Sequence, residues 1–149
     1  MSARLRYAAH TRDQGFTLIE LLVVMIIISI LAAIAIPLFL TQKQKAHETA
    51  AKTDATNIGK EMATFLVDGN PDSISSDLLP ISGPANVMLT STMGATSDTA
   101  TVKVSIGDQL TKLSYTAATG TYCVEVTPVD TQARPWTATP DAVSAGTCP

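Results

Sequence analysis

The segment Gly15-Phe16-Thr17-Leu18-Ile19-Glu20, followed by the apolar run Leu21–Leu40, decides how the N-terminal part of this chain folds. As an α-helix, the roughly 25 residues from Phe16 to Leu40 would extend about 37 Å. A helix needs about 20 predominantly apolar residues to cross a bilayer. The segment therefore predicts a transmembrane helix.

A single carboxylate, Glu20, lies inside this apolar segment. A buried carboxylate costs on the order of 2.5–3.5 kcal/mol on insertion scales, so it usually pairs with a cation, faces a polar cavity or is protonated. The nearest basic side chains are those of Arg12 and Lys43. Cleavage between Gly15 and Phe16 would create an α-amino group, with an ordinary pKa of about 7.7–8.0, close to Glu20. Local chemistry alone therefore allows two interpretations: Glu20 gains a cationic partner on cleavage, or it is an inert residue in the headgroup region.

The run from Gly15 to Val24 resembles the prepilin signature of type IV pilins and the related pseudopilins. The likeness is dense to about Gln44 and extends loosely to Val67. It joins a basic leader, a cleavage site, an acidic residue and a long apolar run, which is a specific combination. The resemblance implies a pilin fold.

The resemblance also implies how the N-terminus is processed. A membrane aspartic peptidase would cleave the leader, residues 1–15, between Gly15 and Phe16, and the same enzyme would methylate the amino group of Phe16. Glu20 would meet the N-terminus of a neighbouring subunit during assembly, and the helix near Pro37 would loosen in the filament. An inert Glu20 is then the weaker alternative.

The leader and the rest of the chain differ in charge. Three arginines and Asp13 give residues 1–15 a net charge of +2, so the remainder of the chain carries −5 within a whole-chain charge of −3. An acidic ectodomain argues against nucleic-acid binding, which needs a basic face. The leader arginines favour a cytoplasmic N-terminus, but Lys43 and Lys45 follow the span, so the orientation depends on the resemblance.

One long helix is predicted from Phe16 to about Val67. Pro37 lies inside it, and its missing N–H and its ring predict a kink. The first half of the helix contains small side chains, which would let another helix approach closely in lipid. The alternative is that they only face the lipid. These residues are Ser29, Ala32, Ala33 and Ala35.

The second half of this helix is predicted to be amphipathic. Apolar residues recur at spacings of four, three, four and four, which predicts a stripe that packs on a sheet or forms a coiled-coil seam. The stripe consists of Ala51, Ala55, Ile58, Met62 and Leu66. The opposite, polar face is predicted to carry Lys52, Asp54, Lys60 and Glu61. Gly69-Asn70-Pro71 predicts the end of the helix.

Four β-strands are predicted after a polar connection at residues 68–86. Alternating apolar and polar residues indicate half-buried strands, and the short connections predict one antiparallel meander. The strands are Val87–Thr92, Thr101–Ile106, Leu113–Ala117 and Thr121–Thr127. Residues 128–149 are predicted to form an irregular loop, in which Trp136 covers the edge of the core or serves as an exposed adhesive contact.

Two cysteines, Cys123 and Cys148, lie near the C-terminus. An even number of cysteines in an exported domain suggests a disulfide, worth about 3 kcal/mol for a loop of this size. Buried free thiols and a metal pair are the alternatives, but the only histidines are His10 and His47. The resemblance also points to a disulfide-closed C-terminal loop.

The predicted fold class is α+β, in which a long N-terminal helix packs on a four-stranded antiparallel β-sheet. The predicted organisation has three parts: a cleaved leader at residues 1–15, a transmembrane or filament-core half-helix at residues 16–41, and a head domain at residues 42–149. No phosphate-binding loop, zinc motif or catalytic triad is evident in the sequence. We therefore predict no enzymatic activity, no cofactor and no metal.

The function predicted from the resemblance is that of a structural subunit of a type IV pilus. The subunit would be anchored in the cell membrane and then assembled into a helical extracellular filament used for adhesion, twitching motility or DNA uptake. Its partners would be further copies of itself, the prepilin peptidase and methyltransferase, an assembly platform and an ATPase, with no direct nucleic-acid binding. Two alternatives remain: a pseudopilin of a type II secretion or competence machine, and a single-span membrane receptor that never polymerises.

Overall fold

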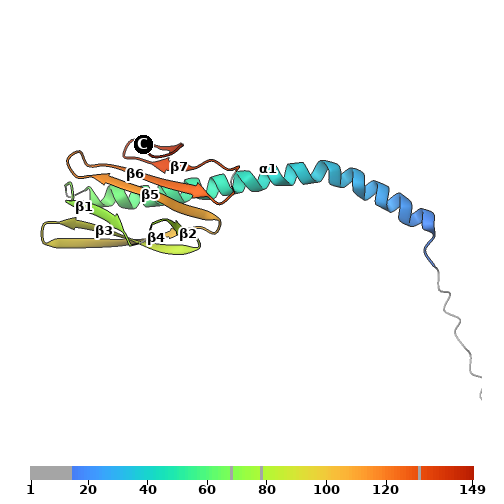
Figure 1. Ribbon diagram of the computed structural model, residues 1–149, viewed down its shortest axis with the longest axis horizontal. Coiled ribbons are helices and arrows are strands. Elements are labelled where there is room, and N and C mark those ends of the chain that lie inside the picture. The colour runs from blue at the N-terminus through green and yellow to red at the C-terminus, as the bar shows by residue number, and fades with distance from the viewer. Residues whose placement is uncertain (1–14, 68, 78, 131) are drawn as a thin grey trace, which may run out of the picture. The chain divides into compact units, whose positions relative to one another are not determined.

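The computed structural model describes residues 15–67, 69–77, 79–130 and 132–149 (Figure 1). Most of the predicted leader, residues 1–14, lies outside the described residues. The chain divides into two compact units, with the boundary between Phe39 and Leu40.

Helix α1, Leu18–Phe65, is the only helix in the described part of the chain and runs through both units. It begins directly after Thr17 and contains Pro37. The helix ends at Phe65, two residues before the predicted end at Val67. Beyond it, Gly69 adopts a φ of 129°, a backbone conformation that favours glycine. Its apolar half is long and hydrophobic enough to cross a membrane, with a mean hydropathy of 3.1 over its most apolar window.

The predicted apolar stripe faces the core of the second unit. Four of its five residues are fully buried: Ala51, Ala55, Ile58 and Met62. Leu66 follows the end of the helix and is partly buried, whereas its neighbour Phe65 is buried. The packing of this stripe on a sheet, and not in a coiled-coil seam, is therefore confirmed.

Within the described residues, eight strands form two antiparallel sheets beside the C-terminal half of α1 (Figure 1). The first sheet has the order β1-β3-β4 and the second the order β2-β5-β6-β7-β8. The strands are β1 Ser73–Ser76, β2 Ile81–Ser82, β3 Ala85–Met93, β4 Thr96–Val104, β5 Asp108–Thr116, β6 Thr121–Pro128, β7 Trp136–Ala138 and β8 Val143–Ala145. The α+β class is confirmed, and β3 to β6 correspond to the four predicted strands.

The prediction of a single four-stranded meander was wrong. Strands β4 and β5 follow each other in the chain but belong to different sheets. At the junction, Ser105 donates from its backbone N–H and its hydroxyl to the carboxylate of Asp54 on α1, at 2.6 and 2.9 Å. Gly107 then adopts a φ of 85° that favours glycine. Asp54 on the helix therefore accepts from a backbone N–H, that of Ser105, which would otherwise be available for strand pairing.

Four short strands lie in segments predicted to be irregular. β1 and β2 lie within the polar connection, and β7 and β8 form a hairpin within the C-terminal segment. They have two to four residues each, too few to show an alternating pattern of apolar and polar residues. Three of them pair with longer strands, β1 with β3, β2 with β5 and β7 with β6, and β8 pairs with β7.

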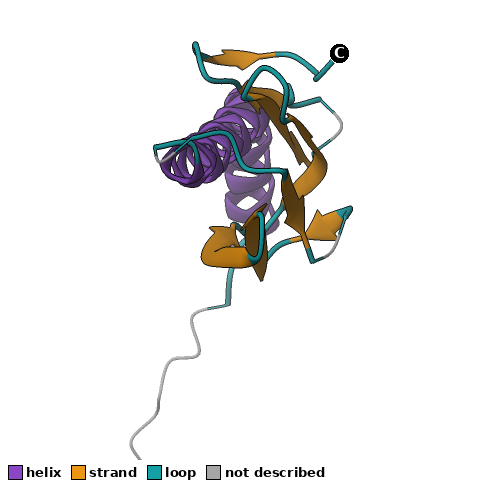
Figure 2. Cartoon of the chain, turned by 90° about the vertical axis from the view of Figure 1, so that its left-hand side faces the viewer, coloured by secondary structure: helices purple, strands orange, loops and turns teal. Residues whose placement is uncertain are grey.

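The strands lie on one side of the helix within the second unit (Figure 2). The core between the strands and the helix is filled by large, fully buried side chains, including Ile58, Met62, Leu89, Leu110 and Val124. Gly59 lets the helix approach β7, because a Cβ at this position would lie 2.8 Å from that of Ala138. The hydroxyl of Tyr122 donates to the carbonyl of Gly59 at 2.9 Å.

Candidate functional site

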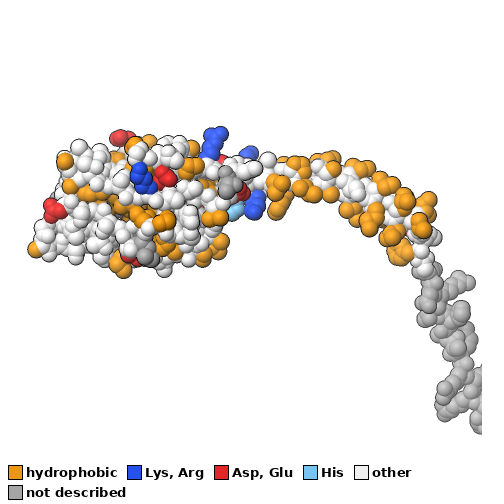
Figure 3. Space-filling view, in the orientation of Figure 1, with side chains coloured by type: hydrophobic (Ala, Val, Ile, Leu, Met, Phe, Trp, Pro, Cys, Tyr) orange, Lys and Arg blue, Asp and Glu red, His pale blue; other side chains and the backbone are white. Residues whose placement is uncertain are grey.

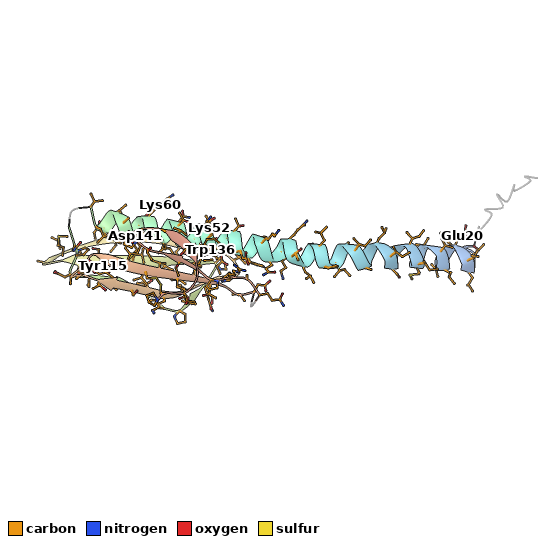
Figure 4. All side chains as sticks on the ribbon, turned by 90° about the horizontal axis from the view of Figure 1, so that it is seen from above. Glu20, Lys52, Lys60, Tyr115, Trp136 and Asp141 are labelled. Carbon is orange, nitrogen blue, oxygen red and sulfur yellow. A yellow bond between two sulfur atoms is a disulfide. The ribbon has the colours of Figure 1, made fainter. Side chains whose placement is uncertain are left out.

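The N-terminal end of α1 is closed by reciprocal hydrogen bonds between Thr17 and Glu20, the latter labelled in Figure 4. The backbone N–H and the hydroxyl of Thr17 donate to Glu20 Oε2 at 2.9 and 2.7 Å. The backbone N–H of Glu20 lies 3.3 Å from Thr17 Oγ1. This is a capping box, in which Thr17 is the N-cap and Glu20 the third helical residue. The carboxylate of Glu20 therefore has partners within its own chain.

Gly15 and Phe16 precede the helix and have no regular secondary structure. The side chain of Phe16 is 87% exposed, and a Cβ built on Gly15 would meet no atom within 4 Å. The peptide bond between these residues is thus accessible to another protein. Cleavage of it would leave the capping box intact, since both capping residues lie on its C-terminal side.

The N-terminal half of α1 exposes a continuous apolar surface. Every Leu, Ile, Val, Met and Phe side chain from Phe16 to Leu40 is exposed, with exposed fractions between 46% and 87%. Figure 3 shows hydrophobic side chains along this half of the helix, whereas on the visible face of the second unit such side chains lie among backbone and side chains that are neither hydrophobic nor charged. Leaving this area in water costs about 25 cal/mol per Å². The surface therefore requires lipid or other apolar surfaces around it.

Two polar features interrupt this apolar half. The hydroxyl of Ser29 donates to the carbonyl of Met25 at 2.7 Å, so this hydroxyl is satisfied within the helix. Pro37 lies in the helix without ending it, and it provides no N–H donor for the carbonyl of Ala33. The helix therefore lacks one backbone hydrogen bond at this level.

A disulfide between Cys123 and Cys148 closes the C-terminal segment onto β6. The two Cα atoms are 5.9 Å apart. The backbone N–H of Cys148 donates to Glu125 Oε2 at 2.8 Å, and the ammonium of Lys112 donates to the carbonyl of Pro149. The C-terminus is therefore fixed by polar contacts in addition to the covalent bond.

Trp136 lies on β7 and packs against the core with its side chain partly buried. The ammonium of Lys52 on α1 is 5.0 Å from the centre of its ring (Figure 4), a cation–π distance. The prediction that the ring covers the edge of the core is therefore confirmed.

The sequence interpretation missed a pair of buried carboxyl groups. Asp54 was predicted on the exposed face of the helix, but it is only 3% exposed and lies among Ala51, Ala55 and Ile58. Asp108 begins β5 and is fully buried. Burial, together with the nearby carboxylate of Asp54, raises the pKa of Asp108 to about 7. The spacing of Asp54 from Ala51 and Ile58 was the signal for its burial, because residues three and four apart share a helix face.

No group of three or more His, Cys, Asp or Glu side chains within the described ranges could hold a metal ion. The predicted residues fall into two separate sets. Gly15, Phe16, Glu20 and Pro37 lie in the first unit, and the two cysteines lie in the second. The chemistry available in the first set is cleavage at an accessible bond, modification of the new amino group and pairing of a carboxylate with a cation.

A long helix that starts with a Thr17–Glu20 capping box, is apolar in its first half and packs on antiparallel sheets in its second half gives a pilin-like α+β fold. Residues 10–36 match the family model of the prokaryotic N-terminal methylation motif. The chain is 54% identical over 57 residues to the type IV major pilin protein PilA of Myxococcus xanthus, covering 38% of this chain and 26% of that protein. It is 37% identical over 78 residues to the type IV wide pilus major component PilA4 of Thermus thermophilus, covering 50% and 60% of the two chains.

Secretion proteins are also among the relatives. The chain is 32% identical over 59 residues to the type II secretion system core protein G of Pectobacterium carotovorum, covering 40% of this chain and 38% of that protein. The matched parts thus span from about a quarter to three fifths of these relatives. No solved structure matches the chain at a significant level. The comparisons show that the chain carries the methylation motif and that its relatives include type IV pilins and secretion system G proteins.

Proposed function

We propose that this chain is the structural subunit of a type IV pilus, cleaved between Gly15 and Phe16 and assembled into a helical filament. The observation that carries the proposal is the capped Glu20 at the start of a long, exposed apolar helix, directly behind an accessible Gly-Phe bond. A plain membrane anchor needs the apolar length alone. It needs neither the carboxylate nor the bond in front of it.

Assembly would exchange the partners of Glu20. In the single subunit the carboxylate accepts hydrogen bonds from the neutral backbone N–H and hydroxyl of Thr17. After cleavage, the amino group of Phe16 in a neighbouring copy would be cationic, because its ordinary pKa is about 7.7–8.0. Charge-assisted hydrogen bonds are roughly twice as strong as neutral ones. The contact would therefore favour the register in which each Glu20 meets the N-terminus of another copy.

The exposed apolar half-helices would bury one another in the filament core. In the membrane the same surface would face lipid, so one segment serves both states. We propose three parts for the chain: the leader at residues 1–15, the core half-helix at 16–41 and the outward-facing head at 42–149. Pro37, with its missing backbone hydrogen bond, would be the place where the helix loosens on assembly.

The proposal implies several partners. A prepilin peptidase and methyltransferase would cleave the leader and methylate Phe16, and an assembly platform with its ATPase would extract the subunit from the membrane. The subunit would be a single-pass protein of the cell membrane before assembly and part of an extracellular fimbrium afterwards. It would have no enzymatic activity of its own and would not bind nucleic acid directly. Adhesion, twitching motility and DNA uptake are all compatible with this role.

The second candidate function is that of a pseudopilin in a type II secretion or competence machine. It is favoured by the likeness to the secretion system core protein G, which extends over 59 residues. A receptor that never polymerises is the third candidate, and it requires an intact leader.

Electron microscopy of surface filaments, combined with mass analysis of the N-terminus, tests the proposal. We expect long fibres built from this chain, with a methylated Phe16 as the first residue. Short assemblies confined to the cell envelope, with the same methylated N-terminus, would identify a pseudopilin. A monomer that retains residues 1–15 would exclude both assembly roles and leave the receptor.

A further inference from the structure

The junction between the two sheets is fixed to α1 by the carboxylate of Asp54. Both oxygens of this side chain accept hydrogen bonds, Oδ2 from the backbone N–H of Ser105 and Oδ1 from its hydroxyl. Ser105 directly follows β4, and Asp108 begins β5. Asp54 therefore holds the point at which the chain passes from one sheet to the other.

Asp108 is fully buried at this junction. Neither oxygen of its side chain has a hydrogen-bond donor among the described residues. Its backbone is held on both sides, since its N–H donates to the carbonyl of Ser105 at 3.2 Å and its carbonyl accepts from the N–H of Gly83 at 2.8 Å. The backbone at Asp108 is therefore fixed at the junction, and its carboxylate would be costly there because it is buried without a donor.

Few charged groups surround Asp108. Helix α1 contributes Asp54 and also His47. The ring of His47 lies close to Gly107, since a Cβ added to that glycine would be 3.1 Å from a ring atom. The residues of β2 and of the end of β6 that flank the junction are uncharged, and Lys103 on β4 is exposed. Asp130, beyond the end of β6, is a further acidic group. The group that acts on Asp108 through both charge and hydrogen bonding is Asp54.

A carboxyl group that is protonated gains one O–H donor. If Asp108 carries a proton, it donates to the Asp54 carboxylate, and neither of the two buried groups is left as an isolated charge. We propose that Asp54 and Asp108 share a single proton, and that this proton is a pH-sensitive clasp holding the junction of the two sheets on α1. Loss of the proton leaves two carboxylates side by side and weakens the attachment of both sheets to the helix.

A proton fits this site better than a metal ion. Both oxygens of Asp54 already accept hydrogen bonds from Ser105, and no third acidic, histidine or cysteine ligand completes a cluster within the described ranges. The clasp lies entirely in the second unit. It is therefore independent of the assembly contact proposed for Glu20.

The linkage between protonation and folding gives a measurable sign. The pKa of Asp108 is raised from its ordinary 3.8 to about 7. Between these values the folded chain holds a proton that the unfolded chain has released, so stability falls as the pH rises. For this group alone, the unfolding equilibrium constant rises by up to about tenfold per pH unit between about pH 4 and 7, and then levels off.

Urea unfolding of the full-length chain in detergent micelles, followed through Trp136 fluorescence from pH 4.5 to 8.5, tests the clasp. Asp108→Asn provides an amide N–H donor towards Asp54 but has no group that titrates. We therefore expect the free energy of unfolding of this variant to depend less on pH than that of the wild type. Asp141→Asn, at an exposed position, is the matched control and should retain the wild-type dependence. Equal pH profiles for the wild type and Asp108→Asn would overturn the proposal.

Two further measurements keep the test decisive if Asp108→Asn does not fold. Infrared spectra of the wild type should show the C=O band of a protonated carboxyl group at pH 5.5, and this band should be lost by pH 8.5. Absence of the band at pH 5.5 would contradict a shared proton. Calcium or magnesium added at pH 8.5 should not restore the stability of the wild type. Full restoration by either ion would show that the two carboxylates bind a metal ion, and the proposal of a proton would be wrong.

Discussion

Thr17 and Glu20 cap each other at the start of α1, with Thr17 Oγ1 2.7 Å from Glu20 Oε2 and 3.3 Å from the backbone nitrogen of Glu20. The reciprocal hydrogen bonds of this capping box explain why a carboxylate can lie at this position before any other copy is present. Its hydrogen bonds are made within the chain and survive cleavage behind Gly15. The free subunit therefore holds Glu20 in a fixed orientation, ready to exchange a neutral partner for a cationic one.

The hydroxyl of Thr17 is the first feature to test. Thr17→Val has nearly the same shape but removes the hydroxyl, so we expect a loss of about 1 kcal/mol of helix stability at the N-terminus. Amide hydrogen exchange of Leu21 and Leu22 in bicelles should become several-fold faster. Thr17→Ser keeps the hydroxyl and should exchange like the wild type, whereas unchanged exchange in Thr17→Val would show that the cap contributes nothing.

The charge of Glu20 is tested separately from its capping role. Glu20→Gln keeps an acceptor for Thr17 but removes the charge that would attract a neighbouring ammonium, and a hydrogen bond to a charged group is worth about 1.5–3 kcal/mol. We expect normal insertion and cleavage with filament yield reduced about tenfold or more, and a similar defect for Glu20→Ala. Asp98→Asn, an exposed substitution of equal charge change, is the control. Abundant filaments from both Glu20 variants would refute the proposed contact.

The helix and its buried stripe could be predicted because their signals are local. Ala51, Ala55, Ile58 and Met62 repeat at helical spacing, and their burial follows from that pattern. The capping box is equally local, since Thr17 and Glu20 have the required spacing. It was missed because Glu20 was interpreted only as a charge in lipid.

The split of the strands into two sheets could not be predicted in the same way. It depends on hydrogen bonds from Ser105 to Asp54, which are 51 positions apart in the chain. No repeat or spacing in the sequence marks such a pair, and a polar side chain on a helix is usually exposed. The burial of Asp108 occurs at the same junction, whereas the short strands β7 and β8 depend on the pairing of β7 with β6 and of β8 with β7.

The disulfide is expected to stabilise the second unit. Replacement of both Cys123 and Cys148 by Ser leaves no free thiol and removes a crosslink with a sequence separation of 25 residues. We expect a loss of about 3 kcal/mol in the free energy of unfolding, measured by urea denaturation with Trp136 as the probe. Lys112→Met, which removes only the ammonium that contacts the C-terminus, should cost less than about 1 kcal/mol. A double Cys variant as stable as the wild type would show that the polar contacts alone fix the C-terminus.

Pro37 is expected to weaken the helix where the filament core forms. Proline is about 3 kcal/mol less favourable than alanine inside a helix, and Pro37→Ala would restore the missing N–H donor. We expect slower amide exchange in the turn before residue 37 in bicelles, and at the same time fewer or stiffer filaments, because the helix would resist loosening on assembly. Leu38→Ala, a neighbouring substitution on the exposed apolar surface, should leave the exchange of that turn unchanged. If Pro37→Ala slows the exchange but filaments form with normal yield and flexibility, local weakening of the helix is not part of assembly.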